Sequence, residues 1–396
     1  MSLLNKFTAV AAIRDGLNTS GHDPTHVVID EILSATEGLV EGRRTILAGT
    51  NNYLGLTFDP ACVAAGQEAL AKQGSGTTGS RMANGSFSAH AALEKEFAAF
   101  YGMPYAMVFS TGYAANLGTL SALLSPGDAV LLDGDAHASL YDGCRMSGAD
   151  VFRFKHNDVA SLEKRIQRLG ERAANCLIVT EGLYSVLGDI APLDEIVEIK
   201  ERYGALLLVD EAHSLGVYGD NGLGVSEMQG VLDKVDFIVG TFSKSLGSMG
   251  GFCVSPHEEL TLFRYISRPF IFTASSSPSI IATTREALRQ LRARPELRHQ
   301  LWQNARQLFD GLNQLGFETG PDVSPVVAVK IGRKEAALEF WNRLLEQGIY
   351  VNLMIPPASP DSSSYLRCSV SAAHTPEQIE TIIDAFRKLK STAIDS

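Results

Sequence analysis

The feature that most constrains the fold is an alternation of short apolar runs and helical patterns between residues 86 and 285. Each apolar run has the length of a buried strand, and a stretch with helical periodicity follows many of them. The apolar runs are 106–110, 129–133, 151–154, 176–181, 205–210, 237–240 and 251–255, and the helical stretches include 90–101, 113–124, 158–169 and 192–203. This alternation predicts an α/β fold with a mostly parallel central sheet and helices on both faces.

The pattern changes at both ends of the chain. Residues 1–45 are expected to form a helix and an irregular, partly extended lead-in, and residues 45–49 a short strand. A long helical region at 278–315 precedes a smaller α+β domain, with strands at 326–331, 350–351 and 365–369 and helices at 333–347 and 375–390. Because 396 residues exceed one small core, we divide the chain into an N-terminal segment (1–50), a large domain (51–285) and a small C-terminal domain (286–396).

Composition excludes several classes of protein. The formal net charge of −11 argues against general nucleic-acid binding, which needs a basic surface. Five scattered cysteines without a CxxC pair predict reduced thiols rather than a disulfide framework or a metal site. The chain shows no signal peptide and no apolar stretch long enough to span a bilayer, so we expect a cytoplasmic protein.

Two polar side chains stand at the ends of buried apolar runs. Lys244 follows the run 237–240 in the segment DFIVGTFSKSLGSMGG, and Asp210 ends the run 205–210. Alone, Lys244 can be an ordinary surface lysine and Asp210 a capping carboxylate, although a buried ammonium is costly unless something uses it. Together they suit pyridoxal 5′-phosphate (PLP). The lysine forms a Schiff base with the aldehyde, and the aspartate keeps the pyridine nitrogen protonated, which makes the ring an electron sink.

Other polar residues after apolar runs complete a candidate PLP pocket, because ligands gather at the carboxyl ends of parallel strands. His213 can hydrogen-bond the ring hydroxyl. The turn at 110–116 opens a helix, whose N–H groups and dipole favour a phosphate, and Thr241 and Ser243 add hydroxyls beside the lysine. His137 can stack on the ring, although a lone histidine at such a position is more often structural.

With these residues the chain resembles the α-oxoamine synthases, fold-type I PLP enzymes that condense an amino acid with an acyl thioester and release carbon dioxide. Within the family it resembles most the branch of bacterial serine palmitoyltransferases. The matching segments cover nearly the whole chain in the expected order: GTNNYLG (49–55), GSGTTGSR (74–81), FSTGYAANLG (109–118), DAHASLYDG (135–143), EGLYSVLGDIAPL (181–193), LVDEAHSLG (208–216), VGTFSKSLG (239–247), RPFIFTAS (268–275) and LRCSVSAAHT (366–375).

The resemblance implies a role for each matching residue around the cofactor. Lys244 would hold PLP and act as the catalytic base, Asp210 would pair with the pyridine nitrogen, and His213 would bind the phenolic oxygen. His137 would stack on the ring. The residues implied for the phosphate side and the lining of the site are Gly112, Tyr113, Ser185, Thr241 and Ser243.

The resemblance also implies a shared site and a substrate pocket. Thr273 would reach the phosphate of the other subunit's cofactor, which implies a homodimer. Arg367 would bind the amino acid carboxylate, and Asn52 would line the substrate pocket. Without the family, Arg367 is a charged residue on an exposed strand and Asn52 a turn former. Thr78, where the branch carries asparagine, and Ser276-Ser277, in place of Leu-Pro, are departures near the expected thioester entrance.

The implied activity is the condensation of L-serine with a palmitoyl-CoA-like acyl thioester to give 3-ketosphinganine and carbon dioxide, the first step of sphingolipid synthesis. The alternative is an α-oxoamine synthase that uses glycine or alanine, of the 8-amino-7-oxononanoate, 2-amino-3-ketobutyrate or 5-aminolevulinate type. An aminotransferase and a regulatory PLP-fold module are more distant alternatives. The acyl donor, acyl-CoA or acyl carrier protein, and a peripheral membrane contact stay open.

Overall fold

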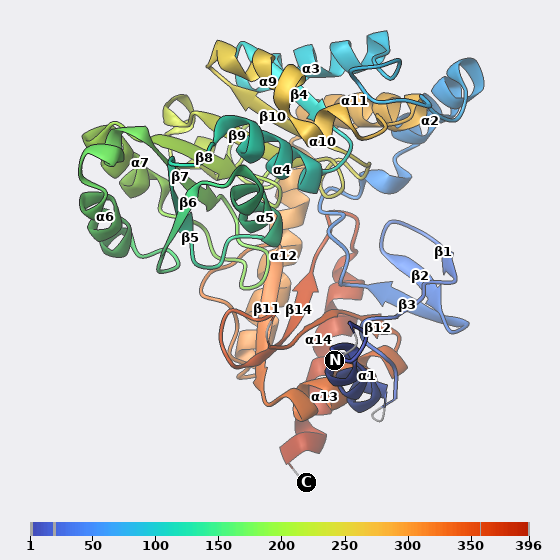
Figure 1. Ribbon diagram of the computed structural model, residues 1–396. Helices are drawn as coiled ribbons and strands as arrows, with labels where there is room; N and C mark the ends of the chain where they lie inside the picture. The colour runs from blue at the N-terminus through green and yellow to red at the C-terminus, as the bar shows by residue number, and fades with distance from the viewer. Residues whose placement is uncertain (1–2, 19–20, 357, 395–396) are drawn as a thin grey trace. The chain divides into compact units, whose positions relative to one another are not determined.

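The computed structural model describes residues 3–18, 21–356 and 358–394. These residues fall into two compact units, whose elements Figure 1 labels. The large unit comprises Leu54–Ser185 and Asp189–Arg298, and the small unit comprises the described residues of Met1–Tyr53, Val186–Gly188 and His299–Ser396. The division of the chain at residues 50 and 285 stays a prediction.

Within the described residues, the large unit is built on a seven-stranded sheet with the strand order β4-β10-β9-β8-β7-β5-β6. The strands are β4 (Tyr105–Phe109), β5 (Ala129–Asp133), β6 (Asp150–Phe154), β7 (Cys176–Glu181), β8 (Leu206–Asp210), β9 (Phe237–Thr241) and β10 (Gly251–Ser255). β10 runs antiparallel to its neighbours β4 and β9, and the other neighbouring strands are parallel. The predicted α/β fold with a mostly parallel sheet is confirmed.

The central strands are continuous apolar runs because helices cover both faces of the sheet. Every residue of β5, β7 and β9 is buried, as expected for parallel strands that meet no water. The helices of this unit are α2 (Pro60–Gln73), α3 (Ser88–Tyr101), α4 (Gly112–Leu123), α5 (Ala138–Ser147), α6 (Val159–Arg168), α7 (Leu193–Tyr203), α8 (Val225–Met228), α9 (Phe263–Ile266), α10 (Arg268–Ile271) and α11 (Pro278–Ala293).

Helix α5 was not predicted, and it packs beside α4 (Figure 1). Its sequence, ASLYDGCRMS, contains glycine, aspartate and two serines, which are weak helix formers, so the helix depends on packing rather than propensity. The predicted helical region at 278–315 is interrupted, because α11 ends at Ala293 and α12 (Glu296–Gln314) begins just after Pro295.

The small unit contains two small sheets among its described residues. One has the order β11-β14-β13, from Val326–Gly332, Ser364–Ser369 and Asn352–Met354. The other has the order β1-β2-β3-β12, from Glu31–Ile32, Glu37–Val40, Arg43–Leu47 and Ile349–Tyr350. The helices that accompany these strands are α1 (Phe7–Asn18), α13 (Lys334–Glu346), α14 (Pro376–Ile394) and the greater part of α12.

The lead-in, which was expected to be irregular and only partly extended, contains a β-hairpin. Strands β2 and β3 pair antiparallel, and Glu41 and Gly42 connect them with φ angles of 52° and 73°. Two consecutive positive φ angles are typical of a type I′ hairpin turn, which usually carries Asn-Gly or Asp-Gly. Because glutamate is unusual at that position, no hairpin signal is recognisable there in the sequence.

Candidate active site

A cavity of about 280 Å³ lies at the carboxyl ends of the large unit's strands. Because Glu181 pairs with Asp210, and Asp210 with Val239, the ends of β7, β8 and β9 stand at one edge of the sheet. The turns after β4 and β5 complete the lining. The lining residues are Thr111, Gly112, Tyr113, Asn116, His137, Ser139, Glu181, Asp210, Ala212, His213, Gly240, Thr241, Ser243 and Lys244.

Asp210 is buried, and hydrogen bonds hold both of its carboxylate oxygens. The Asn116 side-chain amide donates to Oδ2 at 2.7 Å, and the Ala212 N–H donates to Oδ1 at 2.9 Å. The same Asn116 nitrogen donates to the Ser139 hydroxyl at 2.9 Å. The carboxylate is therefore held in one orientation, as an anionic partner for a pyridinium nitrogen must be.

The turn after β5 positions His137 through its backbone and its ring. The His137 N–H donates to Glu181 Oε1 at 2.6 Å, and its Nδ1 accepts the Ser139 N–H at 3.2 Å. Burial lowers the pKa of His137, and the nearby Asp210 raises it while Lys244 lowers it. A ring with a lowered pKa tends to be neutral at pH 7, and a neutral ring can stack without carrying a charge against the cofactor.

Glu181 lines the same cavity as a fully buried carboxyl group. Burial raises its pKa well above the usual value, the neighbouring Asp210 raises it further, and Lys244 opposes both effects. Burial thus favours the protonated form of this carboxyl group, and in that form it can donate a hydrogen bond as well as accept one.

The start of helix α4 forms an anion site beside the end of β9. The Thr111 hydroxyl accepts the Ala114 N–H at 2.9 Å, and the N–H groups of the first turn have no acceptor within the helix. A Cβ at Gly112 would lie 2.8 Å from Thr241 Cβ, so only glycine fits this close approach. Thr241 donates to Gly250 O and lies 3.0 Å from the Ser243 hydroxyl.

These residues fit PLP. An amine, a held carboxylate and a helix N-terminus with adjacent hydroxyls line one cavity, close to the size range of small-molecule sites. The residues fit PLP in that the chemical groups it needs line the same cavity. The roles of the individual residues stay predictions.

Two predicted residues of the large unit lie elsewhere. Ser185 is half-buried in the segment after β7 and is not part of the cavity lining. Thr273 is exposed and lines a separate recess with Arg81 and Phe270. The predicted contact of Thr273 with a second subunit's cofactor stays a prediction.

The predicted substrate residues belong to the small unit. Arg367 is 4% exposed on the central strand β14, between Ala328 of β11 and Asn352 of β13. Its guanidinium donates to the Asn51 side chain at 3.0 Å. The interpretation that Arg367 would have without the family, a charged residue on an exposed strand, is therefore wrong, because the residue is buried and its strand is paired on both edges. Asn52 is also buried.

Sequence reasoning missed Asn116, Ser139 and Glu181. Asn116 lies one helical turn after Gly112, so it faces the same side of α4, and Glu181 ends a strand adjacent to Asp210. The rule that ligands gather at strand ends could have found Glu181. Ser139 lies in helix α5, and because that helix was not predicted, its place in the lining could not be expected.

The fold and the cavity together define a fold-type I PLP-dependent transferase. Residues 44–386 match the model of the family "Aminotransferase class I and II". The chain belongs to this family, and within it to the α-oxoamine synthases that its segments resemble.

The relatives and solved structures agree on this branch. The chain is 53% identical to the serine palmitoyltransferase of Caulobacter vibrioides (strain NA1000 / CB15N) over 98% of this chain and 96% of that protein. It superimposes with a TM-score of 0.96 on a high-resolution structure of SPT with PLP as internal aldimine, at 49% identity and with 99% of each chain covered. It is 37% identical to the 8-amino-7-oxononanoate synthase of Lysinibacillus sphaericus, over 89% of this chain and 91% of that protein.

Proposed function

We propose that the protein catalyses the decarboxylative Claisen condensation of L-serine with a long-chain acyl thioester, giving 3-ketosphinganine and carbon dioxide. The observation that carries the proposal is the near-full-length similarity to serine palmitoyltransferases. It reaches 53% identity, compared with 37% for an 8-amino-7-oxononanoate synthase. The cavity supports the chemistry, because its amine, carboxylate and anion site suit PLP.

When bound, PLP supplies an electron sink for the negative charge that develops at the substrate Cα. Lys244, at the cavity wall, is proposed to anchor the cofactor and then to remove the Cα proton with its amine. Asp210, held by Asn116 and Ala212, would face the pyridine nitrogen. The start of α4 at Gly112 would hold the phosphate.

The remaining residues are proposed to orient the substrate. His137 would stack on the ring, with its backbone fixed by Glu181. His213, a buried residue of the cavity lining, would contact the phenolic oxygen. Arg367 would bind the serine carboxylate, because a guanidinium presents paired N–H donors in one plane.

Assembly and location belong to the same proposal. A homodimer would let the exposed Thr273 reach the partner's cofactor. All five cysteines are buried and unpaired, which suits a reducing cytoplasm. No helix among the described residues has the length and apolarity to cross a membrane. The donor thioester is proposed to be acyl-CoA or acyl carrier protein.

The test is product mass spectrometry with the PLP-loaded full-length protein. Serine, glycine and alanine are each supplied with a panel of acyl-CoA and acyl-carrier thioesters. The expected result is a 3-ketosphinganine-type product from serine and a long-chain thioester. Products from glycine or alanine alone would favour the alternative α-oxoamine synthases. A keto acid formed from serine without any thioester would favour an aminotransferase.

A further inference from the structure

His156 lies between two carboxylates that come from different segments of the large unit. Its Nδ1 is 2.8 Å from Asp133 Oδ1, at the end of β5, and its Nε2 is 2.7 Å from Asp189 Oδ2, in the segment after β7. All three side chains are largely buried, with the histidine side chain 22% exposed. None of the three lines the candidate cofactor cavity.

This geometry favours the charged form of the ring. A neutral imidazole has a single N–H and can donate to only one of the two carboxylates, whereas an imidazolium donates to both. Burial lowers the pKa of His156, but the hydrogen bonds and charges of Asp133 and Asp189 outweigh it and raise the pKa to about 10. The ring is therefore a fixed cation at neutral pH.

One carboxylate connects His156 to the turn that carries His137. Asp133 Oδ1 also accepts the Asp135 N–H at 2.8 Å, and Asp133 Oδ2 accepts the Asn157 N–H at 3.0 Å. Asp135 lies two residues before His137, so the path of the turn depends on how Asp133 is oriented. The His156 cation bonds the same carboxylate oxygen that accepts the Asp135 N–H, and so helps to fix that orientation.

The other acidic residue, Asp189, connects His156 to the segment that begins at Glu181. Asp189 O accepts the Tyr184 N–H at 2.9 Å, and the Tyr184 ring contacts the His156 ring edge to face, with centroids 4.4 Å apart. The Tyr184 hydroxyl reaches the Thr180 hydroxyl at 2.8 Å and the Glu181 N–H at 3.4 Å. Glu181 in turn accepts the His137 N–H, so the two segments meet again at the cavity.

We propose that His156 is a positioning residue: its imidazolium ties the turn of His137 to the segment of Glu181 and so holds both side chains in place in the cofactor cavity. The inference rests on the proposed function, since it assigns His156 a role in supporting that same site. His156 does not line the cofactor cavity, so it would act through Asp133, Asp189 and Tyr184.

The experiment compares the full-length wild-type protein with His156→Gln and with a matched control, His257→Gln. His257 Nε2 lies 2.9 Å from Asp236 Oδ1, so the control also removes a histidine–aspartate pair of the large unit. Neither member of that pair lines the cavity. Hydrogen exchange of the cofactor-free protein, PLP affinity, the absorbance spectrum of bound PLP and the serine kcat and KM are measured for each.

The expected result is specific to His156→Gln. Hydrogen exchange should rise in residues 134–139 and 181–185, PLP affinity should fall, and the spectrum of bound PLP should shift. The value of kcat should fall about 10- to 100-fold, the scale of a misplacement near 1 Å. His257→Gln should keep wild-type exchange in both segments and wild-type PLP affinity. A His156→Gln protein that matches the control in all of these readouts would overturn the proposal.

A second variant keeps the test decisive if His156→Gln does not fold. The Asp189→Asn substitution keeps the shape of the side chain but removes one of the two negative charges beside His156. The same two segments should therefore exchange faster, with a smaller loss of kcat than in His156→Gln. Unchanged exchange and kcat in Asp189→Asn would also contradict the proposal. If the wild-type protein forms no ketone product, the proposed function fails, and exchange in the cofactor-free protein still decides the role of His156.

Discussion

The large and small units hold their candidate functional side chains in different structural positions. In the large unit they stand at the carboxyl ends of strands or just beyond them, as Asp210 ends β8 and Lys244 follows β9. In the small unit Arg367 stands within β14, with backbone partners on both edges. A turn residue is free of the sheet's hydrogen bonds, whereas Arg367 is held by the strand itself. Sequence patterns therefore locate the first kind of site and miss the second.

The largest effect is expected when the Lys244 amine, which follows β9, is removed from the large unit. Lys244→Ala should abolish covalent attachment of PLP and lower product formation by at least about 10³-fold, because both the anchor and the base are lost. The measurement is mass spectrometry of the borohydride-reduced protein together with the product assay.

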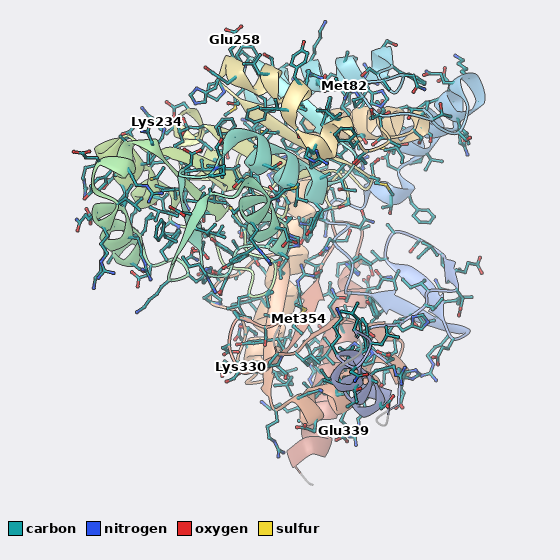
Figure 2. All side chains as sticks on the ribbon, in the orientation of Figure 1. Met82, Lys234, Glu258, Lys330, Glu339 and Met354 are labelled. Atoms are coloured by element: carbon teal, nitrogen blue, oxygen red, sulfur yellow. The ribbon has the colours of Figure 1, made fainter. Side chains whose placement is uncertain are left out.

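The matched control for Lys244→Ala is Lys234→Ala in the same unit, a surface lysine labelled in Figure 2. Lys234 pairs with the exposed Glu201 at 3.2 Å and does not line the cavity. The Lys234→Ala protein should form product at the wild-type rate. A reducible PLP adduct that persists in Lys244→Ala would contradict the assignment of the lysine.

The small unit is tested by Arg367→Lys, which keeps the charge and loses the planar pair of donors. We expect the KM for serine to rise about 10- to 100-fold, since a hydrogen bond to a charged group contributes about 1.5–3 kcal/mol. PLP affinity should stay near the wild-type value. Steady-state kinetics and PLP titration provide the measurements.

The control for Arg367→Lys is Arg343→Lys, on the same unit. Arg343 is 44% exposed on α13 and pairs with Glu339, one helical turn away. Its serine KM should not change. A serine KM within twofold of wild type in Arg367→Lys would remove Arg367 from the substrate site, and the strand-end residues would then carry all of the proposed chemistry.

The same contrast explains how much the sequence could predict. Buried parallel strands read as continuous apolar runs, so the sheet and the polar residues after its strands followed directly, including Asp210 and Lys244. The β2–β3 hairpin was missed because Glu41-Gly42 is an atypical turn. Arg367 was assigned through the family resemblance alone, because the pairing that buries its strand cannot be seen in the sequence of one strand. Glu181 could have been found from its place at a strand end, but its raised pKa could not, because that follows from complete burial and so from tertiary packing.

The smallest expected effect is on how the stability of the protein depends on pH. It is predicted from two largely buried histidines, one in each unit. In the small unit His374 accepts the Ser371 N–H at Nδ1, at 2.9 Å, and burial lowers its pKa to about 4. The unfolded chain therefore binds a proton that the folded chain does not between about pH 4 and pH 6.5, and stability falls as the pH drops through that range. His156 has the opposite sign, because its pKa near 10 makes its contribution fade from about pH 6.5 to pH 10.

Thermal or urea unfolding across pH 5 to 10 measures both effects. Between pH 7.5 and pH 5.5, wild type should lose about 1 kcal/mol more than His374→Asn, whose side-chain oxygen can still accept the Ser371 N–H. Between pH 7 and pH 10, wild type should lose stability relative to His156→Gln, and Asp189→Asn should show a weaker alkaline slope. Equal acid slopes for wild type and His374→Asn would show that folding does not lower the pKa of His374, and the contrast between the two histidines would then fail.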